Sequence, residues 1–166
     1  MIQIEIGGGE TPRKKGYKIC DIRNLPNVHF CCNAIDLDKY VEPSSVTDVY
    51  ARHFMEHLTF AESDKLMDVL KNILVSGGRA EIIVPNMTFH INQWINLKHD
   101  KKSFEHAKAG FWGWQRVLND KSYWDVHKSG YDKDTIKSMI LNKGFVDFCS
   151  HNAESNPHLH VTFRKK

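Results

Sequence analysis

The fold is decided by the stretch MIQIEIGGGE (residues 1–10), in which alternating apolar residues lead directly into three glycines and an acidic residue. A second short strand pattern, at residues 17–21, stops on Asp21. Glycines at the carboxyl end of a strand let the backbone approach a ligand that a β-carbon would push away. A carboxylate that ends the adjacent strand can accept hydrogen bonds from both hydroxyls of a ribose. Together, the two strand ends predict a nucleotide site.

The glycine stretch departs from the dinucleotide-binding fingerprint. That fingerprint needs Gly-x-Gly-x-x-Gly at the start of a helix that meets a pyrophosphate, with an acidic residue about 20 positions further on. Pro12 stands where the third glycine would be, Asp21 comes too early, and residues 10–16 leave room for a turn at most. A ligand without phosphates needs no helix dipole, so the pattern favours S-adenosylmethionine over NAD. The basic run at residues 13–15 keeps a phosphate ligand open, although such a run is more often a solvated turn.

The hydrophobic patterns along the chain predict an α/β fold. Thr59 begins a capping-box sequence, and the apolar spacing after it indicates a helix that we expect Gly77 and Gly78 to end. A second helix is expected at residues 133–142. The strand–helix–strand order around the first helix favours parallel pairing, and we expect the last two strands to form an antiparallel hairpin. Strands are expected at residues 2–6, 17–21, 28–32, 46–51, 79–84, 145–151 and 158–164.

The composition excludes several classes of protein. A chain of 166 residues fits one domain, and we expect a single domain over residues 1–166. Its 23 basic and 20 acidic residues give a formal charge of only +3, and no dense basic run alternates with aromatics, so we expect no nucleic-acid partner. No apolar window approaches the length of a membrane span, so we expect no membrane contact and a cytoplasmic location.

The four cysteines form no Cys-x-x-Cys pair, and we interpret them as small buried residues in a reducing compartment.

Residues 87–130 hold all four tryptophans and show no clean strand period. They directly follow the carboxyl end of a predicted strand, which is the edge where open α/β sheets bind ligands. We therefore interpret the segment as an aromatic-rich insertion over the active-site crevice. Within it, Trp112, Trp114 and Gln115 would give an aromatic wall with one polar group for a substrate, although packing in a core or an interface is the more frequent use of such rings. Exposed tryptophans would also favour a homodimer.

A series of motifs follows in one order along the chain, at IEIGGG (4–9), YKICDI (17–22), SVTDVY (45–50), FMEHL (54–58), LVSGGRAEIIVPN (74–86), HKSGY (127–131) and LNKGF (141–145). This order resembles the class I, Rossmann-like S-adenosylmethionine-dependent methyltransferases, particularly the small predicted methyltransferases with a shortened first crossover. The resemblance covers most of the chain and is weakest over residues 87–121. It implies a three-layer sandwich around a mostly parallel seven-stranded sheet with a C-terminal antiparallel hairpin. It also implies methyl transfer to a small-molecule acceptor such as a sugar or small metabolite; the alternative is a module that binds S-adenosylmethionine or a nucleotide without turnover.

The resemblance also implies roles for individual residues. The glycines would line the aminocarboxypropyl and ribose end of the cofactor, with Glu5 organising their loop from below. Asp21 would hold the ribose hydroxyls, Ile22 would lie against the adenine, and Asn33 with Ala34 would bind the adenine edge. The full set implied to hold S-adenosylmethionine is Glu5, Gly7, Gly8, Gly9, Asp21, Ile22, Asn33, Ala34 and Arg52.

Methyl transfer requires the protein to align the acceptor, exclude water and sometimes remove a proton, and it requires no nucleophilic side chain. Histidine, with a pKa of about 6.5, suits the last task. His53, just beyond the fourth strand, and His127, at the end of the insertion, are the catalytic candidates by position. For His53, shaping the cofactor loop is an equally good interpretation. His127 is favoured because the family carries a histidine there; its alternative is a residue that begins a helix by bonding nearby backbone.

Two other histidine patterns are interpreted as structural. Glu56 and His57 resemble a catalytic pair, but we expect them to hold the loop after the fourth strand. His158 and His160 would lie on one face of a strand, and the sequence gives no third ligand near them. We therefore expect no metal site, and a metal-dependent protein that uses its histidines stays open as a less favoured alternative to methyl transfer.

Overall fold

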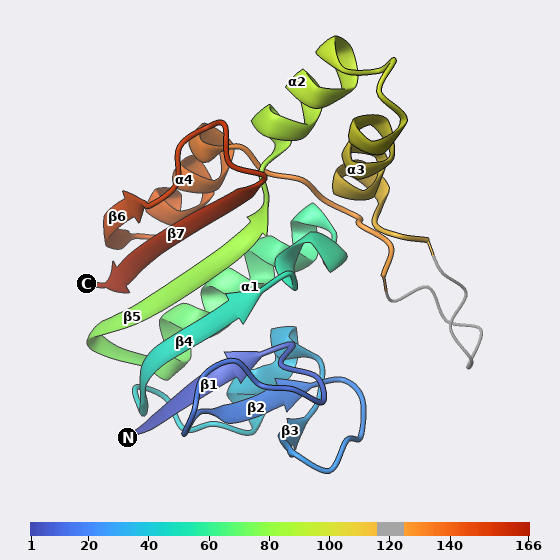
Figure 1. Ribbon diagram of the computed structural model, residues 1–166. Helices are drawn as coiled ribbons and strands as arrows, with labels where there is room; N and C mark the ends of the chain where they lie inside the picture. The colour runs from blue at the N-terminus through green and yellow to red at the C-terminus, as the bar shows by residue number, and fades with distance from the viewer. Residues whose placement is uncertain (116–124) are drawn as a thin grey trace.

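The computed structural model describes residues 1–115 and 125–166 (Figure 1). The strands in this part of the chain are β1 (Ile2–Ile6), β2 (Lys18–Asp21), β3 (Val28–Cys31), β4 (Val46–Arg52), β5 (Leu74–Pro85), β6 (Phe145–Ser150) and β7 (His158–Lys165). The helices are α1 (Phe60–Ile73), α2 (Met87–Asn96), α3 (Lys101–Trp112) and α4 (Lys133–Asn142), with short 3-10 turns η1 (Ala34–Lys39) and η2 (Met55–His57). None of the helices described is long and apolar enough to cross a membrane.

The described strands form a seven-stranded sheet in the order β3-β2-β1-β4-β5-β7-β6. The first five strands in this order, from β3 through β2, β1 and β4 to β5, pair in parallel. Strand β7 runs antiparallel to both β5 and β6, because the chain returns through a hairpin. The predicted Rossmann-like α/β class, with a mostly parallel sheet and a C-terminal antiparallel hairpin, is confirmed.

One face of the sheet is apolar and carries the core. The register aligns a row of buried apolar residues across four strands, Ile4, Val49, Ala80 and Phe163. Helices α1 and α4 cover this face (Figure 1) and bury Leu66, Leu70, Ile136 and Ile140 against it. Because side chains alternate along each strand, the neighbouring row points to the opposite face.

The opposite face is polar and is covered differently. Its matching row is Glu5, Tyr50, Glu81 and Thr162. The loop of residues 7–17, which contains no helix, lies over this row, and the Lys14 ammonium is 3.2 Å from the Glu81 carboxylate and 4.5 Å from the Tyr50 ring centre. In the described chain, this loop therefore takes the place of helices as the outer layer on that side.

The predicted end of the first helix is wrong. Helix α1 ends at Ile73, and β5 begins at the next residue, so Gly77 and Gly78 lie within a strand. The amides of Ser44 and Ser45 donate to the carbonyls of Asn72 and Ile73, at 3.0 and 2.9 Å. These bonds satisfy the carbonyl groups that a glycine cap would otherwise serve, so the helix needs no glycine to end.

The interpretation of the cysteines holds for only two of them. Cys20 and Cys32 are buried, whereas Cys31 and Cys149 are exposed. Cys31 ends strand β3 with its side chain directed away from the core, as the alternation of side chains along a strand requires.

The aromatic-rich segment continues from the carboxyl end of β5 as helices α2 and α3, which lie beyond this edge of the sheet (Figure 1). Trp94 is the centre of their contact, with its ring centroid 4.5 Å from that of Phe104 and 5.5 Å from that of Trp112. Trp124, counted in the segment above, lies outside the described residues. His90 of α2 and His106 of α3 line a cavity together with Pro85 at the end of β5, where the crevice was expected.

Candidate functional site

The Asp21 carboxylate joins the ends of two neighbouring strands. One of its oxygens accepts a hydrogen bond from the Gly9 amide at 3.1 Å. The Arg23 guanidinium also pairs with the carboxylate, and the Arg23 amide donates to it at 3.0 Å. Although burial raises the pKa of the Asp21 carboxyl, the bonds from Arg23 and Gly9 hold that pKa below its usual range. Asp21 is therefore a charged acceptor beside the glycine loop.

The glycine loop is held from below by Glu5. The buried Glu5 carboxylate accepts hydrogen bonds from the amides of Arg13 and Lys14 at 2.9 to 3.0 Å. Gly7 has φ +70°, and a β-carbon there would lie 2.8 Å from the Phe54 ring. The first glycine is thus required both by its backbone conformation and by the close approach of Phe54.

A small cavity of about 100 Å³ opens beside Asp21. The predicted adenosine residues Asp21, Ile22, Asn33 and Ala34 all line it. Asn33 also caps η1, because its side-chain oxygen accepts from the Ile35 amide at 3.3 Å. A carbonyl oxygen has two lone pairs, so this bond leaves Asn33 able to accept a second one.

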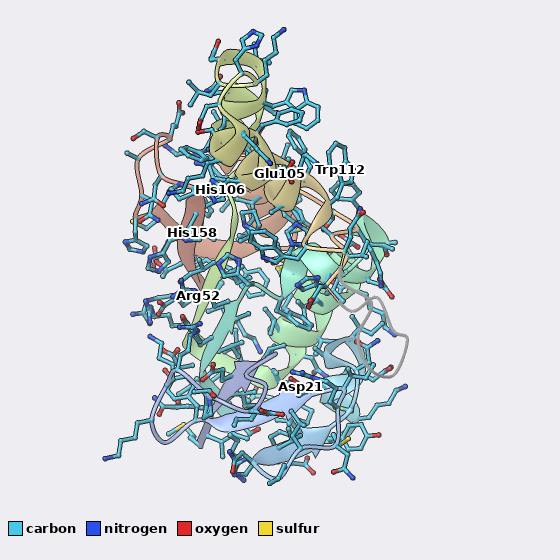
Figure 2. The ribbon with its side chains drawn as sticks, turned by 45° about the vertical axis from the view of Figure 1, so that its right-hand side comes forward. Asp21, Arg52, Glu105, His106, Trp112 and His158 are labelled. Carbon is cyan, nitrogen blue, oxygen red and sulfur yellow. The ribbon has the colours of Figure 1, made fainter. Side chains whose placement is uncertain are left out.

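A second cavity, of about 400 Å³, borders the glycine loop on its other side and is lined by Glu5, Gly7, Gly8, Arg52 and His53, among others. Glu10, Arg13 and Arg23 line it too, so charges of both signs border the cavity. The buried Nε of Arg52 has no hydrogen-bond partner in the part of the chain that the structure describes. The Arg52 side chain also lines the cavity, and a guanidinium in such a place is suited to bind a carboxylate. Figure 2 shows how Arg52 and Asp21 lie relative to the rest of the sheet.

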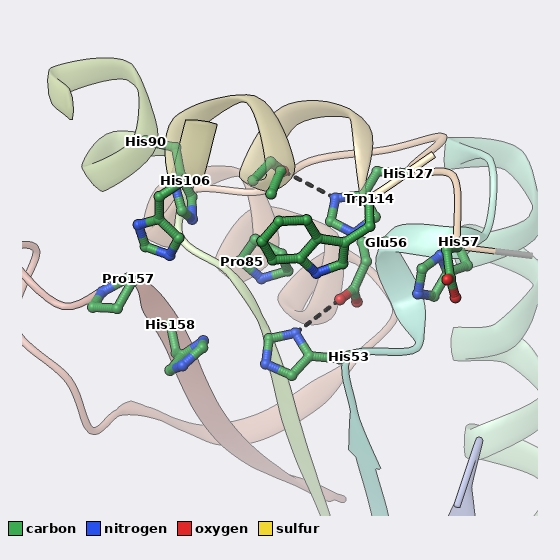
Figure 3. A pocket seen from close by; sticks show the side chains of 13 residues that line it. His53, Glu56, His57, Pro85, His90, His106, Trp114, His127, Pro157 and His158 are labelled. Carbon is green, nitrogen blue, oxygen red and sulfur yellow. Dashed lines mark hydrogen bonds and ion pairs between the residues drawn. The ribbon is translucent and has the colours of Figure 1, made fainter. Parts of the chain in front are cut away.

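A third cavity, of about 440 Å³, lies between the sheet edge and helices α2 and α3 (Figure 3). Histidines dominate its lining: His53, His57, His90, His106, His127 and His158. His57 also borders the cavity beside Asp21, and His53 borders the cavity beside the glycines. The three cavities therefore meet at the segment that follows β4.

Both predicted catalytic histidines line this third cavity, and hydrogen bonds hold each of them. The Nδ1 of His53 lies 3.0 Å from a carboxylate oxygen of Glu56, and the Nδ1 of His127 lies 2.9 Å from the Gly110 carbonyl (Figure 3). Glu56 also uses its backbone carbonyl to accept from the amides of Lys128 and Ser129. Glu56 thus holds the loop, as the sequence suggested, but its side chain reaches the cavity as well.

Burial shifts the acidity of several cavity histidines. It lowers the pKa of His127 and, together with the neighbouring His53, that of His158. Burial and the nearby His106 lower the pKa of His90 to about 4. These imidazoles are therefore held in the neutral form in which one ring nitrogen can accept a proton or bind a ligand.

The predicted aromatic wall is divided between two places. Trp114 lines the histidine-rich cavity, whereas Trp112 and Gln115 border a smaller recess on the outer side of α3 together with Trp114. Sequence reasoning missed His90, which is buried inside α2, and the approach of His106 to it, at 5.1 Å between ring centroids. His90 and His106 stand 37 and 21 positions before His127 in the sequence, so no local spacing could indicate that they share a cavity.

The fold is similar to that of solved methyltransferases. A SAM-dependent methyltransferase from Archaeoglobus fulgidus superposes with a TM-score of 0.64 at 16% identity, over 98% of this chain and 85% of that one. One from Methanosarcina mazei gives 0.61 at 12% identity, over 98% and 91%. Phosphoethanolamine N-methyltransferase 2 from Haemonchus contortus, solved in complex with S-adenosyl-L-methionine, gives 0.60 at 14% identity, over 99% of this chain and 48% of that one.

No protein-family model matches the sequence, and no curated protein matches it. The structural likeness therefore establishes the fold, which is the class I, Rossmann-like methyltransferase fold that the motifs predicted.

His90 provides a test of the cavity's burial through the pH dependence of stability. Its pKa is about 4 in the folded chain and about 6.5 when unfolded, so the unfolded state binds more protons between these values. The contribution of the buried, neutral His90 to the free energy of unfolding should be fully present above pH 6.5 and should decline as the pH falls towards 4. Between pH 7 and pH 5, the free energy of unfolding of the native chain should fall by about 2 kcal/mol more than that of His90→Gln. Urea denaturation measures both, and parallel pH curves would contradict the burial of His90.

Proposed function

We propose that this chain transfers a methyl group from S-adenosylmethionine to a small-molecule acceptor bound in the histidine-lined cavity. The observation that carries the proposal is the charged Asp21 carboxylate bonded to the Gly9 amide at the ends of two adjacent strands. S-adenosylmethionine supplies a methyl group already activated on a sulfonium centre. The chain's own residues therefore need to bind, orient and exclude water.

The residues around the two smaller cavities fit the parts of this donor. Asp21 accepts bonds from the ribose hydroxyls, and Ile22, Asn33 and Ala34 surround the adenine in the cavity of about 100 Å³. Arg52, whose side chain lines the cavity beside the glycines, binds the carboxylate of the aminocarboxypropyl group. The absence of a helix from residues 7–17 leaves no helix N-terminus for a pyrophosphate, which argues for this donor over NAD.

The histidine-lined cavity receives the acceptor. Its volume of about 440 Å³ lies within the range of small-molecule sites. His53 and His127 are the catalytic residues in this proposal, because both line this cavity and hold their rings by Nδ1, leaving Nε2 available to the acceptor. Trp114 gives the apolar contact, whereas Trp112 and Gln115 would contact only a longer acceptor that reaches past α3.

Replacing Asp21 tests the donor site. Asp21→Ala should weaken binding of S-adenosylhomocysteine by about 1–3 kcal/mol, or about 5- to 150-fold in Kd, because the ribose loses its charged acceptor. Isothermal titration calorimetry of the purified chain measures this. Unchanged binding in a folded Asp21→Ala variant would show that the ribose lies elsewhere, and tighter binding of NAD than of S-adenosylhomocysteine would remove the proposal.

Arg23→Ala is the matched control for Asp21→Ala. Arg23→Ala breaks the ion pair between Arg23 and Asp21 by removing the guanidinium, and it leaves the Asp21 carboxylate in place. The Arg23 side chain is half exposed, and pairs of this kind contribute about 0–1 kcal/mol, so binding should change by less than about fivefold. Equal losses in both variants would mean that the ion pair, and not the ribose contact, supports the site.

His127 tests the acceptor side. In a screen of acceptor compounds for release of S-adenosylhomocysteine, His127→Ala should lower kcat at least tenfold because general acid–base or positioning contacts are lost, while Kd for S-adenosylhomocysteine stays within about twofold. Equal turnover would retire His127 from the site. Binding of S-adenosylhomocysteine with no turnover for any acceptor would favour the alternative of a binding module.

A further inference from the structure

Three side chains converge at the wall of the histidine-lined cavity. Within the described residues, Glu56, His57 and His127 each place a potential ligand atom within 4.8 Å of the other two. Glu56 and His57 belong to η2, directly after β4, whereas His127 comes from the segment that follows the aromatic-rich helices. The rings of His57 and His127 meet edge to face, with centroids 5.1 Å apart.

The hydrogen bonds of the two imidazoles determine which ring nitrogen remains free to bind a ligand. The Nδ1 of His57 lies 3.2 Å from the Val126 carbonyl, and the Nδ1 of His127 lies 2.9 Å from the Gly110 carbonyl. A carbonyl oxygen can only accept, so each Nδ1 carries the hydrogen. In the neutral ring, each Nε2 then keeps a free lone pair. Histidines that bind metals are held in this way, with the other ring nitrogen donating to a backbone carbonyl or a carboxylate.

Glu56 provides a second, independent observation. Glu56 is only 1% exposed, and its carboxylate oxygen Oε1 lies 3.0 Å from the Nδ1 of His53. The other oxygen, Oε2, is buried and has no hydrogen-bond partner anywhere in the described chain. A buried carboxylate oxygen without a partner is costly, and a cation would remove that cost.

We propose that Glu56, His57 and His127 bind a divalent transition-metal ion, with zinc as the best match. Two neutral imidazole nitrogens and one carboxylate oxygen form a three-ligand set that zinc uses when a fourth position stays open. Bond lengths of about 2.1 Å in a tetrahedral site put the ligand atoms about 3.4 Å apart, so the three side chains must move together by about 1 Å. His53 orients the carboxylate, and the two backbone carbonyls orient the rings.

The other histidine pair does not share this site. The Nε2 of His160 lies 3.2 Å from the Glu81 carboxylate on the polar face of the sheet, whereas His158 packs edge to face with His53. The ligands of the proposed ion are therefore not the histidines of strand β7. The proposal departs from the prediction, made from the sequence, that the chain has no metal site.

Because all three residues line the cavity that is proposed for the acceptor, an open coordination position of the ion would be accessible from that cavity. There the ion would bind an acceptor oxygen. The Nε2 of His127 would then be a metal ligand, so His127 would position the ion and His53 would be the histidine left to remove a proton. This last step rests on the proposed methyl transfer, whereas metal binding does not.

The test uses cobalt(II) as a probe on the purified full chain after removal of metals with a chelator. One cobalt ion per chain is expected, with visible absorption bands of a four- or five-coordinate site that zinc abolishes by competition. Glu56→Gln and His127→Ala should each weaken cobalt binding at least tenfold, since even the loss of an outer hydrogen bond to a ligand costs 10- to 100-fold. His106→Ala, in the same cavity but outside the trio, should bind cobalt like the native chain.

Two results would overturn the metal site: native chain that binds no stoichiometric cobalt, or trio variants that bind it as well as His106→Ala does. Circular dichroism and binding of S-adenosylhomocysteine report whether each variant is folded, and His57→Ala replaces any that is not. Because S-adenosylhomocysteine binding is measured separately, a native chain that binds S-adenosylhomocysteine but no stoichiometric cobalt contradicts only the metal site. A native chain that binds cobalt but no S-adenosylhomocysteine contradicts only the proposed methyl transfer.

Discussion

The hydrogen bond from the Gly9 amide to the Asp21 carboxylate is the interaction on which the site depends. It joins the carboxyl ends of β1 and β2, which are neighbours in a parallel sheet, and it directs a charged oxygen pair at the cavity beside them. Glu5 makes this possible by binding the amides of Arg13 and Lys14, so that the loop turns back without a helix. The short link therefore leaves these strand ends with no helix dipole beside them, which suits the proposed donor, a ligand without phosphates.

The fold was predictable where local patterns and burial agree. The alternation in β1, the capping box at Thr59 and the final hairpin all appear in the sequence, because each depends on neighbouring residues alone. The end of α1 was not predictable, because the amides that complete it come from Ser44 and Ser45, before the strand that precedes the helix. The exposure of Cys149 likewise depends on which neighbours cover its strand.

The residues of the proposed donor site could be predicted from the sequence more readily than those of the proposed acceptor cavity. Asp21, Ile22 and Asn33 follow strand ends, and topology brings such ends to one edge of the sheet. The histidine cavity is assembled instead from η2, α2, α3 and the start of β7. His57 and His127 are 70 positions apart, and the packing of α3 against the cavity brings them together, with Gly110 supplying the carbonyl that orients His127. No local sequence pattern could predict the contact between Gly110 and His127.

The most direct test of the donor site is a crystal structure of the chain with S-adenosylhomocysteine. The account predicts that the ribose hydroxyls bond the Asp21 carboxylate, that the adenine fills the cavity lined by Ile22 and Asn33, and that the sulfur faces the cavity of His53 and His127. A ligand bound elsewhere, with Arg23 still holding both oxygens of Asp21, would contradict it.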